Sequence, residues 1–343
     1  MQAAVYHACG GPEQIRIEAV PRPEVGRSDV LVRVRACALN WMDVLVRRGP
    51  APSGMTFPFW GGADVAGAIE ATGADVVGLR EGARVLVNPS LWCGACEWCL
   101  AGEESVCARF QILGDEVRGG MAELVSVPAR NVLPIPEDFP DEEAAAVPLT
   151  FQTAWRALLT QGRIRPGQDV LILGASGGVG SAAVQIAKLA GARVFALTSS
   201  DAKAEALRRL GADEILDRRV GDFSHELLKR TADRGVDLVV ENVGTPTWQQ
   251  SLRCVARGGR LVSYGRTGGS IGETDIRDLF IRQIHISGSS MGSRRDFQQV
   301  MRLVFARRLR PLIDSVLPLA QARQAFERLE SGNQIGKIVL RVA

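Results

Sequence analysis

Four cysteines crowded into fifteen residues are the side chains in this sequence best suited to bind a metal. Cys93, Cys96, Cys99 and Cys107 lie in the segment CGACEWCLAGEESVC, spaced as CxxCxxC with the fourth cysteine after seven further residues. Four thiolates fill the tetrahedral coordination of Zn²⁺ and leave no position open for water or substrate. The pattern therefore predicts one structural zinc ion per chain.

Two other uses of these thiols stay open from the spacing alone. A four-iron cluster also uses CxxCxxC, but its last cysteine normally follows after three residues and precedes a proline. Here Cys107 follows after seven residues and precedes Ala108. A redox-active thiol pair is the second alternative. The remaining cysteines, Cys9, Cys37 and Cys254, are predicted to be small packing residues.

A glycine-rich turn is the second feature that predicts chemistry. In LILGASGGVGSAAVQIAK, a short apolar strand runs through glycines into a helix, which is the setting of a dinucleotide fingerprint. A strict GxGxxG is absent, and the segment contains AxGxxG instead. Glycines let the backbone approach a pyrophosphate, and free N–H groups at the helix start bind its charge. We therefore expect cofactor contacts at Gly174, Ser176, Gly177, Gly178, Val179 and Gly180; the alternative is a glycine turn without a ligand.

The end of the next strand bears on the choice of cofactor. Enzymes that use NAD place an acidic residue about twenty positions after the glycines, where it binds the adenine ribose. This chain has Ser199, Ser200 and Lys203 there, and hydroxyls with an ammonium suit the 2′-phosphate of NADP. We predict NADPH over NADH. Asp201 keeps NAD as an alternative, and the segment also reads as a plain helix cap.

The pattern along the chain predicts two domains. From residue 169 onward, short β-branched runs alternate with helical segments, which indicates βαβ units and a doubly wound parallel sheet of six strands. Residues 1–149 contain short alternating strands and read as a strand-rich, partly barrelled domain. We place the dinucleotide-binding domain at residues 150–289, and expect residues 290–343 to pack back onto the first domain. A helix beginning in EDFPDEEAAAVPLTFQTAW is expected to link the two.

Composition narrows the range of partners. Forty-one basic and 38 acidic residues give a net charge of +3, too weak to indicate nucleic acid as a partner. No apolar run approaches the roughly 20 residues that span a bilayer, and the amino terminus does not resemble a secretory signal. We therefore expect a cytoplasmic enzyme with a small-molecule substrate and without nucleic-acid or membrane partners.

Together these features resemble the medium-chain dehydrogenase/reductase superfamily, which includes the zinc alcohol dehydrogenases and the quinone oxidoreductases. The resemblance covers essentially the whole chain. It implies a GroES-like catalytic domain, with the structural zinc lobe at about residues 90–110, and a Rossmann domain. In the zinc alcohol dehydrogenases a second, catalytic zinc has three protein ligands, and their positions fall at Asn40, Ala63 and about Leu149. None of these side chains is a usual zinc ligand.

The missing ligands favour a particular reaction. Oxidation of an alcohol needs help in removing the hydroxyl proton, which a catalytic zinc supplies. Reduction of a carbon–carbon double bond conjugated to a carbonyl produces an enolate, which needs only hydrogen-bond donors and a proton. The segment ALNWMDVLVRRG also resembles the quinone oxidoreductase branch. We therefore predict hydride transfer from NADPH to a quinone, an enone or a related activated alkene, with an acyl-CoA thioester as a further candidate.

The resemblance assigns roles to individual residues. Asn40 is expected near the nicotinamide or the substrate carbonyl, with a satisfied turn amide as the alternative. Asp64 is either a cleft carboxylate or the structural partner of Arg47 or another base. The cofactor's nicotinamide side is expected to contact Thr153 and Val243, and Gly265 is a further expected cofactor contact. Many quinone reductases have a tyrosine where this chain has Leu45, so the proton donor is not identified and water is a candidate.

Two other functions and an oligomeric state are also expected. One alternative is an alcohol dehydrogenase whose unusual metal site uses Asp64 and a cysteine such as Cys37. Another is a catalytically silent protein that binds NADPH. The resemblance also implies a homodimer or homotetramer, formed through the edge strand IHISGSS across a two-fold axis.

Overall fold

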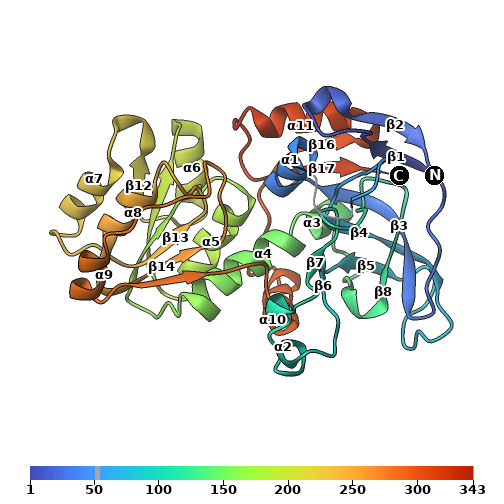
Figure 1. Cartoon of the computed structure of the whole chain (residues 1–343), viewed down its shortest axis with the longest axis horizontal. Coiled ribbons are helices and arrows are strands. Elements are labelled where there is room, and N and C mark those ends of the chain that lie inside the picture. The colour runs from blue at the N-terminus through green and yellow to red at the C-terminus, as the bar shows by residue number, and fades with distance from the viewer. Residues whose placement is uncertain (51–54, 343) are drawn as a thin grey trace. The chain divides into compact units, whose positions relative to one another are not determined.

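The computed structural model describes residues 1–50 and 55–342 and contains two compact units (Figure 1). The first comprises Met1–Leu149 and Phe297–Ala343, and the second comprises Thr150–Asp296. The boundaries expected from the sequence are 149/150 and 289/290. In the structure they are 149/150 and 296/297, and the second of these lies within helix α10 (Arg294–Phe305).

The first unit is built on a seven-stranded sheet. Its strand order is β16 (Ile313–Pro318), β17 (Lys337–Arg341), β3 (Asp29–Ala38), β4 (Asp64–Thr72), β5 (Arg84–Val87) and β9 (Val132–Pro134), and β8 (Leu124–Pro128) also pairs with β3. Smaller two-stranded sheets join β1 (Gln2–Val5) to β2 (Arg16–Ala19), and β6 (Ser90–Leu91) to β7 (Gln111–Ile112). All of these pairs are antiparallel except β16 with β17.

The C-terminal segment completes the core of this unit. β17 pairs antiparallel with β3, and α11 (Ala322–Glu330) turns Phe326 and Leu329 into the same apolar cluster as Val32 and Val34 of β3. Burial of such side chains stabilises a fold by about 1.5–3 kcal/mol each. The remaining helical elements of the unit are short: η1 (Pro12–Gln14), α1 (Trp41–Arg48), α2 (Glu97–Leu100), η2 (Glu104–Val106), η3 (Ala129–Asn131), α3 (Asp141–Ala145) and η6 (Leu319–Gln321).

The second unit is a six-stranded parallel sheet, as the sequence predicts. Its order is β12 (Glu214–Asp217), β11 (Arg193–Thr198), β10 (Asp169–Ile172), β13 (Val236–Glu241), β14 (Val255–Ser263) and β15 (His285–Gly288). The chain therefore moves outward from β10 in one direction and then from β13 in the other. Right-handed crossovers place the helices of the two halves on opposite faces, and a ligand site is expected where the order reverses, between β10 and β13.

The helical elements of this unit either precede β10 or connect its strands. They are α4 (Pro148–Trp155), the π-helical segment η4 (Arg156–Gln161), α5 (Gly178–Leu189), α6 (Asp201–Arg209), η5 (Arg218–Val220), α7 (Phe223–Arg230), α8 (Trp248–Cys254) and α9 (Ile276–Arg282). The three central strands β10, β11 and β13 are almost wholly buried, as parallel strands covered on both faces must be, whereas the edge strand β15 is largely exposed. Among the described helices, none is both long enough and apolar enough to cross a bilayer.

The expected linking helix is divided in the structure. α3 begins with the acidic residues Asp141, Glu142 and Glu143, which suit a helix amino terminus. It ends before Pro148, and α4 begins at that proline. Proline disfavours helical backbone at the preceding residue but is well tolerated at the first position of a helix. The sequence pattern identified the helical segment and missed the break.

Candidate functional site

The four clustered cysteines converge in the first unit. Cys93 and Cys96 precede α2, Cys99 lies within it, and Cys107 follows η2, so two short helical turns position the sulfurs. Their Sγ atoms all lie within 4.8 Å of one another, with Cys93–Cys99 at 3.8 Å and Cys96–Cys99 at 3.5 Å. Four sulfurs at about 2.3 Å from a tetrahedral zinc ion would be about 3.8 Å apart. The spacing therefore suits a zinc ion, and all seven cysteines are free of disulfides.

The electrostatics of the cluster favour a bound cation. Main-chain N–H groups of Ala95 and Cys96 point at Cys93 Sγ from 3.5 and 3.4 Å and lower the pKa of that thiol to about 5. Burial raises the pKa of Cys99 to about 12. Four thiolates at this spacing repel one another unless a positive ion lies between them. The cluster fits a structural zinc, with no coordination position left for a substrate.

A buried polar network lies at the carboxyl end of β3. Asp64 begins β4, Lys337 begins β17, and Asn40 follows β3 at the start of α1, so the sheet brings all three together. Lys337 Nζ donates to Asp64 Oδ2 at 2.8 Å and to Asn40 Oδ1 at 2.6 Å. Asp64 is fully buried, and Lys337 and Asn40 are 4% and 8% exposed. A buried charge needs such a partner, because desolvation without one is very unfavourable.

Asp64 has its lone pairs occupied within this network. Oδ2 accepts from Asn40 Nδ2 at 2.9 Å as well as from Lys337, and Oδ1 accepts from the Leu149 N–H at 2.6 Å. Of the two structural pairings expected for Asp64, with Arg47 or with another base, the structure has the second, because the Arg47 guanidinium binds Glu330 and the Gly10 carbonyl. The base that pairs with Asp64 is Lys337.

Asn40 is held in the same way. Its Nδ2 donates to Asp64 and, at a longer 3.4 Å, to the Ala38 carbonyl, while Oδ1 accepts from Lys337. This is the satisfied amide that the sequence left as an alternative. A substrate carbonyl could receive a hydrogen bond from Asn40 only by replacing the long bond to Ala38. A catalytic role for Asn40 stays a prediction.

Sequence reasoning missed Lys337. The residue opens an apolar strand, KIVLR, and a lysine at such a position must either reach solvent or pair with an acid. Its partner lies 273 residues away in the chain. The apolar residues after Lys337 indicate that this lysine is unusual, but no pattern in the sequence identifies Asp64 as its partner.

Asp43 supports the network from the first turn of α1. Its carboxylate accepts from the Asn40 N–H at 2.7 Å and the Gly62 N–H at 2.8 Å. Burial raises the pKa of Asp43 to about 6 despite these bonds and the nearby Lys337. The Asp43 carboxyl group therefore connects Asn40, the residue before α1, to Gly62 in the segment before β4. Ala63 lies in the same segment.

The predicted cofactor residues of the glycine-rich turn lie at the carboxyl end of β10. Gly174 follows β10 with φ +56°, and Gly177 caps α5, which begins at Gly178. A methyl group on Gly180 would come within 2.3 Å of the Gly174 carbonyl oxygen, so glycine is required there. Ser176 lies within the turn, and Val179 lies in the first turn of α5. The free N–H groups of that first turn can bind an anion.

Ser199, Ser200 and Lys203 follow β11, the strand beside β10. Ser200 is the N-cap of α6, and its Oγ accepts from the Lys203 N–H at 3.3 Å. The capping role left open by the sequence is therefore present. It does not exclude contacts to a 2′-phosphate, and the preference for NADPH stays a prediction.

Two loops on the other side of β10 hold further predicted cofactor residues. Val243 follows β13, and Gly265 follows β14. The buried Glu241 carboxylate accepts from the N–H groups of Val243 at 2.6 Å and Gly244 at 3.1 Å, and from the hydroxyls of Thr247 and Ser251. Sequence reasoning missed this carboxylate, which belongs to the last residue of an otherwise mostly apolar strand. Thr153 lies in α4 with its Oγ1 3.9 Å from Met291 Sδ.

Buried polar atoms without partners mark the same edge of the sheet. In the described part of the second unit, five side-chain atoms are buried without a hydrogen bond: Thr198 Oγ1, Asn242 Oδ1, Gln250 Oε1, Tyr264 Oη and Ser289 Oγ. All but Gln250 lie at or directly after the carboxyl ends of strands. Since such atoms normally have partners, this edge fits a bound polar ligand such as a dinucleotide.

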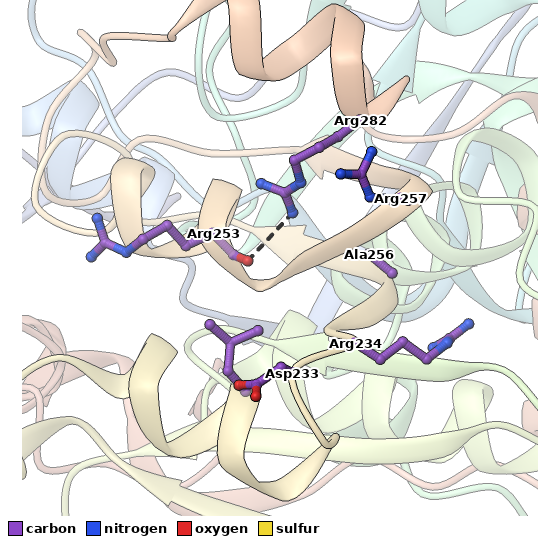
Figure 2. A pocket seen from close by; sticks show the side chains of 7 residues that line it. Asp233, Arg234, Arg253, Ala256, Arg257 and Arg282 are labelled. Carbon is purple, nitrogen blue, oxygen red and sulfur yellow. Dashed lines mark hydrogen bonds between the residues drawn. The ribbon is translucent and has the colours of Figure 1, made fainter.

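An arginine-lined hollow of about 520 Å³ lies at the opposite edge, before β13 and at the start of β14 (Figure 2). Arg282 binds the Val255 carbonyl and Asp278, and Arg257 binds the Ile281 carbonyl at 3.2 Å. Arg253 pairs with Asp222, and Arg234 pairs with Asp237. These arginines satisfy carbonyls beside α8 and α9 and pair with nearby acids, so they do not form an open anion site.

The cysteine cluster yields a prediction on metal content. Protein purified without chelator should be colourless and hold about one zinc per chain, because four thiolates saturate one ion. Replacement of Cys107 by Ser should remove most of that zinc and expose the lobe to proteolysis. The matched control, Cys9→Ser, lies outside the cluster and should keep its zinc. Elemental analysis checks both variants, and a brown iron-containing protein would contradict the assignment.

Asp43 yields a prediction on pH. The folded state holds the Asp43 proton up to about pH 6, whereas the unfolded chain releases it near pH 4. The folded state therefore binds more protons between these values, and its stability falls as pH rises through this window. The free energy of unfolding of the wild type, relative to Asp43→Asn, should fall by about 1–3 kcal/mol from pH 4 to pH 6.5. Urea titrations across this range measure the difference, and a flat or rising difference would refute the account.

Comparison with known proteins identifies the family. Residues 26–137 match the alcohol dehydrogenase GroES-like domain, and residues 178–306 match the zinc-binding dehydrogenase family. An acryloyl-coenzyme A reductase from Sulfurisphaera tokodaii is 32% identical over 333 residues, which cover 96% of this chain and 98% of that protein.

Solved structures agree. A crystal structure of an NAD-dependent alcohol dehydrogenase is 41% identical, with a TM-score of 0.96 and 100% of both chains covered. A crotonyl-CoA carboxylase/reductase, AntE, in complex with NADP is 27% identical with a TM-score of 0.93, covering 100% of this chain and 94% of that one. The chain therefore belongs to the zinc-type medium-chain dehydrogenase/reductase superfamily of oxidoreductases, with a GroES-like domain and a Rossmann parallel sheet.

Proposed function

We propose that this protein is an NADPH-preferring reductase that adds hydride to a carbon–carbon double bond conjugated to a carbonyl, without a catalytic zinc. The network around Asp64 carries the proposal. Its Oδ2 binds the Lys337 ammonium and its Oδ1 binds the Leu149 N–H, so the carboxylate is already compensated. The positions that hold catalytic zinc ligands in the zinc alcohol dehydrogenases are occupied here by Asn40, Ala63 and, at about the third position, Leu149. The Asn40 amide is already hydrogen-bonded, and the other two side chains are aliphatic. In the described part of the chain, the cysteine cluster is the one group of three or more converging metal-ligating side chains.

The chemistry follows from these residues. The glycine-rich turn after β10 would hold NADPH, which would supply the hydride for the β-carbon, and the α-carbon would take a proton. Asn40 would stabilise the enolate oxygen with the N–H that otherwise makes the long bond to Ala38. Lys337 positions that amide by binding its oxygen. The proton donor is water in this proposal, since the Tyr6 and Tyr264 hydroxyls are buried and burial raises the pKa of both.

The relatives support an activated alkene of the acyl-CoA class. Acryloyl-coenzyme A reductase and crotonyl-CoA carboxylase/reductase are both named for enoyl thioesters. A thioester carbonyl conjugated to a double bond makes the β-carbon electrophilic, as in an enone or a quinone. We place a 2-enoyl thioester first among the substrates, with quinones and enones as the other members of the class.

A second function is favoured by one comparison. The alcohol dehydrogenase structure at 41% identity is the more similar of the two solved structures, and its name specifies NAD. It supports oxidation of an alcohol with NAD⁺ as the alternative. For NADPH the support is the absence of a carboxylate at the end of β11, where Thr198 is followed by two serines, together with the NADP bound in AntE.

A homo-oligomer built through β15 forms part of the proposal. β15 is the last strand of its sheet, so one side of its backbone is free to pair. Exposed apolar side chains lie in β15 and in the chain segment before it: Ile286 in the strand, Ile276, Phe280 and Ile281 in α9, and Ile271 before α9. A two-fold axis at this edge would join two such strands and cover the apolar groups.

A substrate screen tests the reaction. The purified enzyme should oxidise NADPH with acryloyl-CoA, crotonyl-CoA or a quinone, and incubation with EDTA should leave the initial rate within about twofold, since no metal acts at the reacting carbonyl. NADH should give a lower kcat/KM. Chelator-sensitive oxidation of primary or secondary alcohols, with no enoyl reduction, would establish the alternative function instead.

Asn40→Ala tests the assigned donor. The variant should lose roughly ten- to hundredfold in kcat with little change in KM, as expected when a donor acts mainly on the transition state. Its zinc content should stay at about one per chain. Asn131→Ala is the matched control, because the buried Asn131 amide binds only main-chain carbonyls of Asn88 and Ser90 among the described contacts and should affect stability alone. Unchanged kinetics in Asn40→Ala would remove this residue from the reaction.

A further inference from the structure

We infer that Asn242 is a cofactor-binding residue whose side-chain oxygen accepts a hydrogen bond from a hydroxyl of the ribose on the nicotinamide half. Asn242 directly follows β13, and β13 pairs with β10 where the strand order reverses. It is thus next to the glycine-rich turn, but in a loop that the dinucleotide fingerprint does not include. The inference rests on the dinucleotide cofactor of the proposed function.

The amide lies between two glycines. A methyl group built on Gly174 would come within 2.9 Å of both Nδ2 and Oδ1 of Asn242. On the other side, a methyl group on Gly265 would lie 3.3 Å from Asn242 Cβ. Both glycines are predicted cofactor contacts, and both leave room for this amide. The side chain therefore reaches the same edge as the turn after β10.

The side-chain oxygen lacks a protein partner. Oδ1 is buried without a hydrogen bond among the described residues. Such an acceptor destabilises a folded protein, so native proteins rarely keep one without a reason. A ligand that donates a hydrogen bond here would remove that penalty on binding.

The loop around Asn242 is held firmly by its main chain. The Asn242 carbonyl accepts from the Thr267 N–H at 3.0 Å and the Thr267 hydroxyl at 3.2 Å. The buried Glu241 carboxylate fixes the next two N–H groups. Gly268 N–H binds the Val243 carbonyl at 2.7 Å, which joins this loop to the one after β14. The amide is thus presented on a rigid support, which reduces the entropy lost when a ligand binds.

The chemistry of the acceptor selects the part of the cofactor. Pyrophosphate oxygens and the glycine-loop N–H groups already complement each other, and a carbonyl oxygen cannot donate to a phosphate. Ribose hydroxyls can donate. Ser199 to Lys203, expected beside the adenine ribose, follow β11, whereas Asn242 follows β13 across the point where the order reverses. The ribose on the nicotinamide side is therefore the partner.

Equilibrium binding without substrate tests the assignment. Asn242→Ala should weaken NADPH binding about tenfold, measured by the fluorescence of the bound nicotinamide, as expected for one lost hydrogen bond and its unpaired group. Binding of 2′,5′-ADP, which lacks the second ribose, should be unchanged. Gln250→Ala is the matched control, because its Oε1 is also buried and unpartnered but lies in α8, and it should bind both ligands normally.

Other outcomes are decisive as well. Equal weakening of NADPH and 2′,5′-ADP, or no weakening of either, would overturn the role of Asn242. If Asn242→Ala does not fold, Asn242→Leu keeps the volume without the acceptor and should show the same selective loss. If the wild type prefers NADH, the same comparison is made with NADH and ADP. Wild-type protein that binds cofactor but reduces no activated alkene would refute the proposed reaction and leave this assignment intact.

Discussion

The buried ion pair between Lys337 and Asp64 is the interaction on which the polar network of the first unit depends. An ammonium and a carboxylate removed from water are stable only when each has its partner and its hydrogen bonds. Here the pair joins the starts of β17 and β4 at the end of β3, and it orients Asn40. With that carboxylate already compensated, the region needs no divalent cation to balance its charge. The zinc-free reaction that we propose depends on this arrangement.

A different constraint organises the second unit. Because its six strands are parallel, their carboxyl ends all lie at the same edge of the sheet. Glycine at 180 allows the backbone of the turn to pass closely, glycine at 174 leaves room for the Asn242 amide, and Glu241 holds the loop after β13. The polar atoms left without partners gather at this edge. At the opposite edge, the arginines bind main-chain carbonyls and acidic side chains. A ligand is therefore expected at the edge formed by the carboxyl ends of the strands.

Local patterns in the sequence predicted the features that depend on residues close together in the chain. The cysteine spacing indicated a zinc site, and alternation of strands and helices indicated the six-stranded parallel sheet. What the sequence could not supply was pairing across long separations. Asp64 meets Lys337 rather than Arg47, and the partner of Arg47 is Glu330 near the other end of the chain. Such pairs depend on sheet register and on the return of the C-terminal segment, which no local motif encodes.

The most direct test of the central claim is an anomalous-scattering map at the zinc edge, from crystals grown with NADPH. The account predicts a single peak per chain, surrounded by the four cysteine sulfurs, and an Asp64 carboxylate still bonded to the Lys337 ammonium. A second peak with Asp64 or Cys37 in its coordination sphere would contradict it.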